Sequence, residues 1–141
     1  MSNDGALEVC EALARASSVV SSGVEAGLGH VFGLGFTDLM IMRGLAGSEV
    51  PPRRVDLAER MGMTASGVTR ALVPLEKLGL VDRVRDARDA RASRASLAEA
   101  GREKLRDATE SAAEQARRLL TARLEASEIA ELGRILAKLN S

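Results

Sequence analysis

The stretch of sequence that decides the fold is residues 55–79, which read VDLAERMGMTASGVTRALVPLEKLG. Its apolar spacing predicts a short helix over residues 55–61 and a longer helix over residues 65–78. Gly79 follows at the C′ position, where glycine commonly ends a helix. The tight turn between the two helices ends at Thr64, a candidate N-cap. Two helices joined by such a short, glycine-containing turn predict a helix-turn-helix.

The second of these helices has two sides of different chemistry. At 100° per residue, Val68, Leu72 and Leu75 share one side and predict a buried stripe, with Ala71 beside it. The opposite side carries hydroxyls, cations and one apolar residue but no acid: Ser66, Thr69, Arg70, Val73 and Lys77. Hydroxyls and cations suit phosphates and base edges, and a valine suits a thymine methyl. An ordinary solvated face would more often include Glu or Asp, so the pattern favours contact with DNA.

The segment that follows Gly79 is rich in arginine and can be interpreted in two ways. Residues 83–94 hold five arginines and two aspartates. Intrinsic propensity favours an alanine-rich helix with an arginine at every third position from 85 to 94. The alternative is a β-hairpin in which residues 80–84 lead out, 86–89 turn and 92–96 return. The residue pattern by itself leaves both interpretations open.

Helices are also expected on both sides of this region. Residues 6–28, 36–45 and the chain from residue 97 onwards show apolar steps of three and four, with Thr37 and Ser127 as candidate caps. The glycines of residues 27–35 lack the third glycine of a dinucleotide-binding loop, so a flexible connection is expected there. Residues 50–52, Val-Pro-Pro, predict an extended segment. Pro74 removes one backbone donor inside the second helix and should kink it.

Composition sets limits on the function classes. The chain has 141 residues with 20 basic and 20 acidic side chains, enough for one domain or one small domain with added helices. The longest uncharged stretch is 12 residues, short of a membrane span, and no leader opens the chain. A single cysteine, Cys10, excludes an internal disulfide and indicates a reducing cytoplasm. With one histidine, His30, and no catalytic constellation, we expect no enzyme activity, no metal and no cofactor.

Several motifs occur in a fixed order: LAERMGMTASGVTR at residues 57–70, LEKLGLVDR at 75–83, DAR at 89–91 and LAEAG at 97–101. This combination resembles the MarR family of bacterial winged helix-turn-helix regulators. The resemblance runs without gaps over residues 57–101, and the terminal helices fit the family layout. It implies a cytoplasmic protein with a mainly α fold and a small β-hairpin. The chain would divide into an N-terminal dimerisation segment (1–34), a DNA-binding lobe (35–100) and C-terminal dimerisation helices (101–141).

The resemblance also implies which residues bind DNA as part of a transcriptional regulator. The hairpin would be a wing whose arginine, Arg91, enters the minor groove, with Asp89 bracing it. Two departures from the family pattern bear on this. Ala98 replaces the usual threonine cap, and Ala90 replaces a frequent arginine, leaving Arg88 or Arg91 for the minor groove. The full set of candidate DNA contacts is Arg53, Arg54, Thr64, Ser66, Gly67, Thr69, Arg70, Val73, Lys77, Arg88 and Arg91.

A homodimer is expected because each end of the chain offers an apolar stripe that one small winged domain cannot cover. The residues expected to be buried by the partner are Leu7, Val20, Leu132, Leu136 and Leu139. Such a dimer would bind an inverted repeat with half-sites about one helical turn apart. The alternative is a dimeric helical interaction protein without DNA affinity.

Sensing is the least specified function. Many MarR-family members release DNA when a small aromatic acid binds between the lobes, and His30, Phe32 and Phe36 lie near that junction. Another branch senses peroxides through a cysteine in the first helix. Cys10 lies there, but that branch positions its thiolate with tyrosines, which this chain lacks. A lone cysteine on an apolar stripe is usually a small buried hydrophobe.

Overall fold

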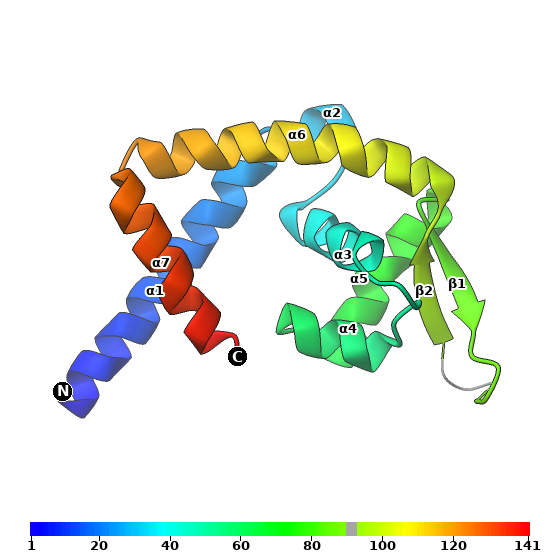
Figure 1. The fold of residues 1–141 in the computed structure, drawn as a ribbon, viewed down its shortest axis with the longest axis horizontal. Coiled ribbons are helices and arrows are strands. Elements are labelled where there is room, and N and C mark those ends of the chain that lie inside the picture. Colours follow the sequence, from blue (N-terminus) through cyan, green and yellow to red (C-terminus); the bar gives the residue numbers. More distant parts are fainter. Residues whose placement is uncertain (90–92) are drawn as a thin grey trace.

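The computed structural model describes residues 1–89 and 93–141. The elements are, in order, α1 (Asn3–Glu25), α2 (Gly29–Phe32), α3 (Phe36–Ala46), α4 (Arg54–Met61), α5 (Ala65–Lys77), β1 (Val81–Arg85), β2 (Ser93–Leu97), α6 (Glu99–Thr121) and α7 (Ala126–Leu139). The molecule is elongated, and α6 runs along most of its length (Figure 1). The helices α3, α4 and α5 and the hairpin gather at one end of α6, and α1 and α7 lie at the other. Fold class and helix-turn-helix are as the sequence predicts.

The main core lies where α3, α4, α5 and the hairpin meet. Ile41, Met42, Leu57, Val68 and Leu72 are all fully buried. The stripe predicted from the helical wheel is therefore confirmed, since Leu75 is also buried and the neighbouring alanine is half-buried. At about 1.5–3 kcal/mol for each fully buried aliphatic side chain, this stripe holds α5 in one orientation.

The arginine-rich segment forms a hairpin, not a helix. Its strands are antiparallel, with Val81 opposite Leu97 and Arg85 opposite Ser93, so each boundary lies one residue later than expected. Ala95 is buried and donates its N–H to the Pro52 carbonyl at 3.2 Å. This bond, with the bridge between Arg53 and Arg94, adds the extended residues before α4 to the edge of β2. Pairing with a distant segment thus overrides the helical propensity of the alanines.

Some local predictions at helix starts are wrong. The N-cap of α3 is Gly35 instead of Thr37, and Asp38 accepts the Gly35 N–H at 2.8 Å. Similarly, α7 is capped at Glu125 instead of Ser127, and Glu128 accepts the Glu125 N–H at 2.8 Å. In both cases a carboxylate three residues into the helix binds the cap N–H, which is half of a capping box.

The glycine-rich connection also differs from its prediction, because α1 ends at Glu25 and residues Gly29–Phe32 form one helical turn, α2. The C-terminal half of α1 packs closely on α6. Ser111 donates its hydroxyl to the Gly27 carbonyl at 3.1 Å, and a Cβ on Gly23 would lie 3.1 Å from Leu119. Glycines in this half of α1 therefore allow the close approach of α6.

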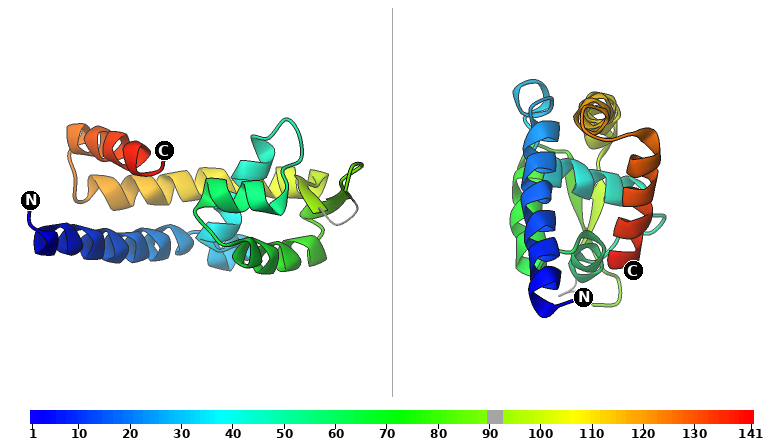
Figure 2. Two further views of the ribbon diagram at one scale, coloured as in Figure 1. Left: turned by 90° about the horizontal axis from the view of Figure 1, so that it is seen from below. Right: turned by 90° about the vertical axis from the view of Figure 1, so that its left-hand side faces the viewer.

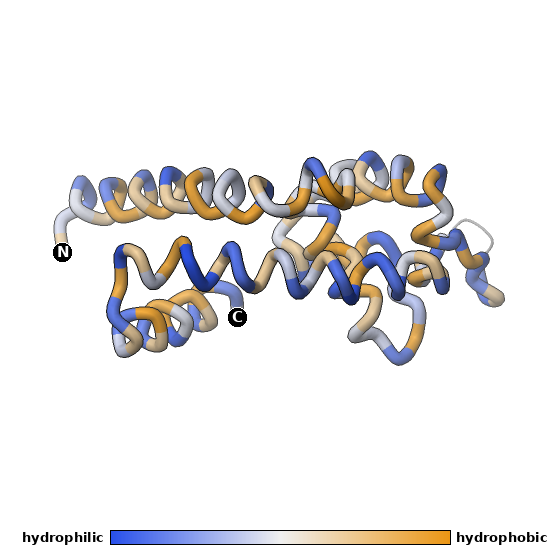
Figure 3. The backbone as a smooth tube through the Cα atoms, turned by 90° about the horizontal axis from the view of Figure 1, so that it is seen from above, coloured by the Kyte–Doolittle hydropathy of each residue, from blue (hydrophilic) through white to orange (hydrophobic). Residues whose placement is uncertain are grey.

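The N-terminal half of α1 diverges from α6 (Figures 1 and 2) and leaves large apolar side chains uncovered. Leu7 is 57% exposed, Leu132 38% and Leu139 65%, while Val20 and Leu136 are partly buried. Figure 3 shows apolar residues recurring along the whole of α1. The terminal helices therefore present an apolar surface that one copy of the chain does not bury. Among the described residues, no helix has both the length and the apolar character to cross a bilayer.

Candidate nucleic-acid interface

The recognition helix of the helix-turn-helix is α5, and its start is defined by a side-chain cap. The Thr64 hydroxyl accepts the Gly67 N–H at 3.0 Å, as predicted for an N-cap. Gly67 also fits closely, because a Cβ there would lie 3.0 Å from the Thr64 hydroxyl oxygen. Gly79 ends the helix region with φ +72°, the left-handed conformation expected at C′.

The outward face of α5 carries the side chains that the wheel placed there. Ser66, Arg70 and Lys77 are exposed, and none has a side-chain partner within the described part of the chain. Val73 is 36% exposed between them. Two cations, a hydroxyl and a methyl-bearing side chain are thus free to contact a ligand. This is the combination that phosphates, base edges and thymine methyls can use.

Thr69 differs from its neighbours on this face because it is half-buried and bonded. Arg54 of α4 donates from Nη1 to the Thr69 hydroxyl at 3.1 Å, and its Nη2 lies 3.6 Å from Glu76. Glu76 also pairs with Arg83 of β1 at 3.4 Å. The side chain of Arg54 is only 20% exposed. Arg54, predicted as a DNA contact, therefore joins α4 to α5, and Glu76 extends the link to β1 through Arg83. The O–H of Thr69 remains available as a donor.

Arg53 lies at the N-cap of α4 and is largely exposed. It donates from Nε and Nη2 to the two oxygens of Asp56, both at 3.1 Å. Its side-chain hydrogen bonds lower the pKa of the Asp56 carboxyl, and Asp56 in turn raises the pKa of Arg53. Asp56 also accepts the Arg53 backbone N–H at 3.1 Å, so the pair closes the start of α4. Asp56 therefore partly compensates the positive charge of Arg53, a residue that was predicted to contact DNA.

The turn end of the hairpin is held by an arginine that the sequence interpretation treated only as part of a stripe. Arg94 of β2 donates to Asp86 at 3.0 Å and to the Pro51 carbonyl at 2.8 Å. Asp86 also accepts the Arg88 backbone N–H at 2.9 Å, and this bond, with the Arg94 side chain, lowers the pKa of Asp86. One guanidinium thus ties the hairpin turn to the segment before α4.

The hairpin tip is only partly described. Arg88 and Asp89 are exposed. Arg91 and Ala90 lie outside the described residues, and so does the predicted bracing of Arg91 by Asp89. The Arg88 side chain forms no hydrogen bond or ion pair with the described residues, which leaves an exposed cation in the turn of the hairpin.

A cavity of about 220 Å³ lies between α1, α3 and α6, and we call it the inter-lobe cavity. Of the three residues predicted to bind a ligand, Phe36 lines this cavity, together with Arg43 and Thr109. His30 is exposed, and neither His30 nor Phe32 is among its lining residues. Its other lining residues are apolar: Val20, Val24, Leu39, Ala112, Ala113 and Ala116.

Two further observations concern chemistry outside DNA contact. Cys10 is exposed on α1, so the expectation of a small buried hydrophobe is wrong for the single chain. Within residues 1–89 and 93–141, no group of three or more His, Cys, Asp or Glu side chains could hold a metal ion.

Sequence reasoning missed the contacts of Arg54 and Arg94. Their partners lie 15 and 43 residues away in the chain, at Thr69 and Pro51. The sequence offered one signal for this network, the opposite charges of Glu76 and Arg83 within LEKLGLVDR, which form an ion pair in the structure.

A helix-turn-helix followed by a two-stranded hairpin, with a cationic face on the second helix, defines a winged helix-turn-helix protein. The sequence pattern of the MarR family matches residues 32–92. The chain is therefore similar to this family over the helix-turn-helix and the first strand of the hairpin. No curated protein matches the sequence.

Solved structures share the fold over nearly the whole chain. The transcriptional regulator BldR from Sulfolobus solfataricus is 28% identical, with a TM-score of 0.80 over 98% of this chain and 99% of BldR. A probable transcriptional regulator from Pseudomonas aeruginosa is also 28% identical, with a TM-score of 0.81 over 93% and 96% of the two chains. Sco3205, a MarR-family regulator from Streptomyces coelicolor solved with DNA, is 24% identical, with a TM-score of 0.84 over 99% and 88%.

Proposed function

We propose that the protein is a homodimeric regulator of transcription that binds an inverted-repeat DNA site and catalyses no reaction. The observation that carries this proposal is the outward face of α5, where Ser66, Arg70 and Lys77 are exposed and unpaired among the described residues. The opposite face of the same helix is fully buried at Val68 and Leu72. A rigid helix with a free cationic face is what a major-groove reader requires.

Each part of the interface has its own task in this proposal. Ser66, Thr69 and Arg70 contact base edges and nearby phosphates, and Val73 meets a thymine methyl. The hairpin reaches the adjacent minor groove with Arg88 and Arg91, where the narrow groove concentrates negative potential. Thr64 and Gly67, at the start of α5, lie against the sugar-phosphate backbone of the DNA. Sco3205, which shares this fold, is solved in complex with DNA, which supports the proposal.

The terminal helices supply the second copy that an inverted repeat needs. Leu7 on α1 and Leu139 on α7 are more than half exposed in the single chain. Covering such apolar area is favourable by roughly 25 cal/mol for each Å² removed from water. Residues 1–34 and 101–141 then form a dimer lobe, and residues 35–100 a DNA-binding lobe.

We also propose that the inter-lobe cavity receives a small effector. Arg43 and Thr109 supply a cation and a hydroxyl within an otherwise apolar lining, and Phe36 supplies a flat apolar surface. Small-molecule sites usually have a mostly apolar lining with a small number of polar groups. A small aromatic acid fits this chemistry.

The test is a titration of two labelled duplexes, one from the region upstream of the chain's own gene and one of random sequence, at two salt concentrations. We expect the wild-type protein to prefer the upstream duplex. Arg70→Ala should cost about 1–3 kcal/mol per subunit on that duplex and less on random DNA. Lys104→Ala, which removes one cation from α6 and none from α5 or the hairpin, is the matched control. Equal affinity for both duplexes, or an Arg70→Ala variant that binds like the control, would count against the proposal.

A further inference from the structure

The turn end of the hairpin contacts the rest of the protein through one guanidinium, that of Arg94 on β2. Its Nε donates to Asp86 at 3.0 Å, its Nη2 lies 3.0 Å from the same carboxylate, and its Nη1 donates to the Pro51 carbonyl at 2.8 Å. The side chains of Arg94 and Asp86 are only 27% and 11% exposed. All three guanidinium nitrogens therefore face an internal acceptor. We call these contacts of Arg94 with Asp86 and Pro51 the hairpin tether.

The segment that receives the tether is rigid. Pro51 accepts from the Arg94 side chain, and the carbonyl of Pro52 accepts the Ala95 N–H at 3.2 Å. A pyrrolidine ring fixes φ at both prolines, and Pro52 is also buried. The sequence Val-Pro-Pro, which was predicted only as an extended segment, thus presents two fixed carbonyl groups to two consecutive residues of β2.

The same segment leads directly into the helix-turn-helix. Arg54, the first residue of α4, donates to the Thr69 hydroxyl of α5 at 3.1 Å. A continuous series of contacts therefore runs from Asp86 in the hairpin turn, through Arg94 and Pro51, to α4 and on to α5. The tether is the part of this series that joins the turn of the hairpin to the helices.

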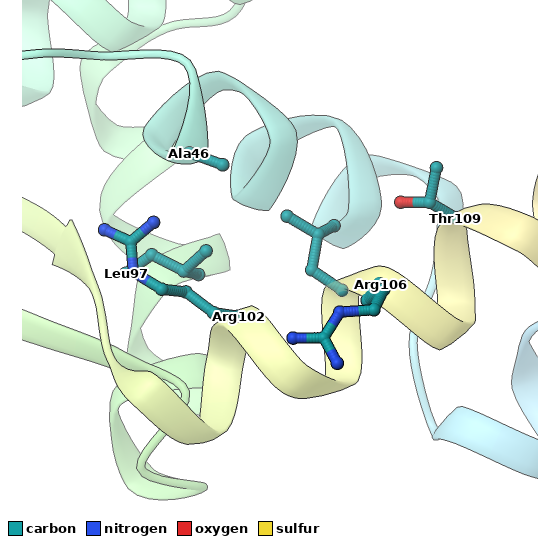
Figure 4. Close-up of a pocket in the computed structure, with 6 residues that line it drawn as sticks. Ala46, Leu97, Arg102, Arg106 and Thr109 are labelled. Carbon is teal, nitrogen blue, oxygen red and sulfur yellow. The ribbon is translucent and has the colours of Figure 1, made fainter.

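The base of the hairpin is held in a different way. Figure 4 shows Leu97, the last residue of β2, in a groove of about 360 Å³ beside α6. Leu97 and its partner Val81 are 6% and 2% exposed, so burial of apolar side chains holds the two strands there. At the turn end the last pair is Arg85 with Ser93, and neither residue is buried. The position of the turn therefore depends on polar contacts, and the tether supplies them.

We propose that Arg94 is a positioning residue for the DNA interface, which fixes the hairpin turn relative to α5 and does not itself contact DNA. This proposal rests on the proposed function. The cation that it positions is Arg88, whose side chain has no partner among the described residues. Asp86 accepts the Arg88 backbone N–H at 2.9 Å, so the carboxylate that binds Arg94 also shapes the backbone that carries Arg88.

Direct contact of Arg94 with a phosphate is the alternative role, and the two roles predict opposite effects of Asp86→Asn. This change removes a negative charge and keeps a side-chain oxygen that can accept the Arg88 N–H. If Arg94 contacted phosphate, loss of the competing carboxylate would free its guanidinium and strengthen DNA binding. If Arg94 positions the turn, loss of its ionic partner weakens binding, although the interface becomes more positive.

The experiment is a fluorescence anisotropy titration of the labelled upstream and random duplexes with the full chain at three salt concentrations. The variants are Arg94→Gln, Asp86→Asn and the double variant. Asp82→Asn is the matched control, because it removes the same charge from an exposed position on the same hairpin, and Asp82 has no side-chain partner in the described part of the chain. Urea unfolding of each variant identifies conditions in which all of them are folded, and the titrations are made there.

We expect Arg94→Gln and Asp86→Asn each to weaken binding to the upstream duplex about fivefold, the effect of losing one hydrogen-bonded contact. The double variant should bind as the weaker single variant does, because both changes break the same contact. Asp82→Asn should bind at least as tightly as the wild type. Tighter binding by Asp86→Asn, an unchanged affinity in Arg94→Gln, or additive losses in the double variant would overturn the proposal.

A second pair of changes separates positioning from a general loss of stability. In the wild type, Arg88→Ala should weaken binding and reduce the slope of log affinity against log salt by about 1 per subunit. In the Arg94→Gln background the same change should cost at most about half as much, because the turn no longer holds Arg88 at the DNA. A protein that was merely less stable would keep the full effect of Arg88→Ala. An equal effect in both backgrounds would therefore refute the positioning role.

Amide hydrogen exchange of the free protein tests the tether without DNA. We expect Arg94→Gln to lower the protection of the Ala95 N–H about tenfold and to leave that of Leu72 in α5 unchanged, since only the hairpin should open more often. Unchanged protection of Ala95 would show that Arg94 does not hold the hairpin. If the wild type binds neither duplex, the proposed function fails, whereas the exchange measurement still decides whether the tether exists.

Discussion

Arg54 in α4 donates a hydrogen bond to the Thr69 hydroxyl in α5, and this 3.1 Å contact links the two helices of the helix-turn-helix. The same guanidinium lies 3.6 Å from Glu76, about two turns further along α5. Arg54, which was predicted to contact DNA, thus also holds the two helices of the motif in their relative position. Thr69 consequently has a role inside the protein in addition to the DNA contact proposed for it.

This relationship separates two neighbouring hydroxyls that look equivalent in the sequence. Thr69→Ala removes the Arg54 contact and should lower the free energy of unfolding by about 1 kcal/mol, the usual net value of such a bond. Ser66→Ala, exposed and unpaired among the described residues, should change it by less than about 0.5 kcal/mol. Urea unfolding of both variants measures this, and both should weaken binding to the upstream duplex. Equal stability losses would show that the Arg54 contact contributes nothing.

Gly101 in α6 is buried against the hairpin connection. A Cβ on this residue would overlap the carbonyl oxygen of Leu80, which is backbone and cannot rotate away. Gly101→Ala should therefore destabilise the protein by about 1–3 kcal/mol, as overpacking does, despite the better helix propensity of alanine. Gly133→Ala in α7 is the control, because nothing lies within 4 Å of its added Cβ. It should stabilise by about 0.5–1 kcal/mol. Thermal unfolding in which both variants shift in the same direction would contradict this.

Stability should depend on pH through Glu114. Hydrogen bonds from Arg117 and then Arg118 lower the pKa of Glu114 from 4.5 to about 2. Because the folded-state pKa lies below the unfolded one, this carboxylate stabilises the fold above pH 4.5, and its contribution disappears as the pH falls towards 2. Glu114→Gln should flatten the decline in unfolding free energy over this interval. Glu110→Gln, exposed and without a partner in the described residues, should retain the wild-type slope. An unchanged slope in Glu114→Gln would refute the prediction.

The dimer can be tested by placing charge on the uncovered apolar surface. Leu7→Glu and Leu139→Glu alter side chains that are 57% and 65% exposed in the single chain, so the monomer should still fold. We expect sedimentation equilibrium at micromolar concentration to show a dimer for the wild type and a shift towards monomer for both variants. Val50→Glu alters a side chain that is 68% exposed but lies outside the terminal helices, and it should remain dimeric. A stable wild-type monomer would remove the basis for an inverted-repeat site.

Much of the helix-turn-helix could be predicted from sequence because its determinants are local. The spacing of Val68, Leu72 and Leu75 gives the buried side of α5 directly, since the helical period relates positions only three and four residues apart. Thr64 at the start and Gly79 at the end lie within a turn of the groups they satisfy. Local rules failed at Thr37 and Ser127, because each helix begins two residues earlier, where a carboxylate three residues after the cap accepts the cap N–H.

The sequence by itself determined the type of fold, the buried and outward sides of α5 and the family motifs, because periodicity and capping act over a few residues. For the arginine-rich segment, the residue pattern left helix and hairpin open and the family resemblance implied the hairpin. Only the tertiary structure shows what holds that hairpin, since Arg94 and Ala95 bond to Pro51 and Pro52 some 43 residues away. It also decided which arginines are engaged in internal contacts and which are free. Arg54 and Arg70 are the same residue type on neighbouring helices, and only the position of Thr69 and Glu76 in space makes the first a brace. Charge and hydrogen bonding act over ångströms in space, and distance along the chain does not record them.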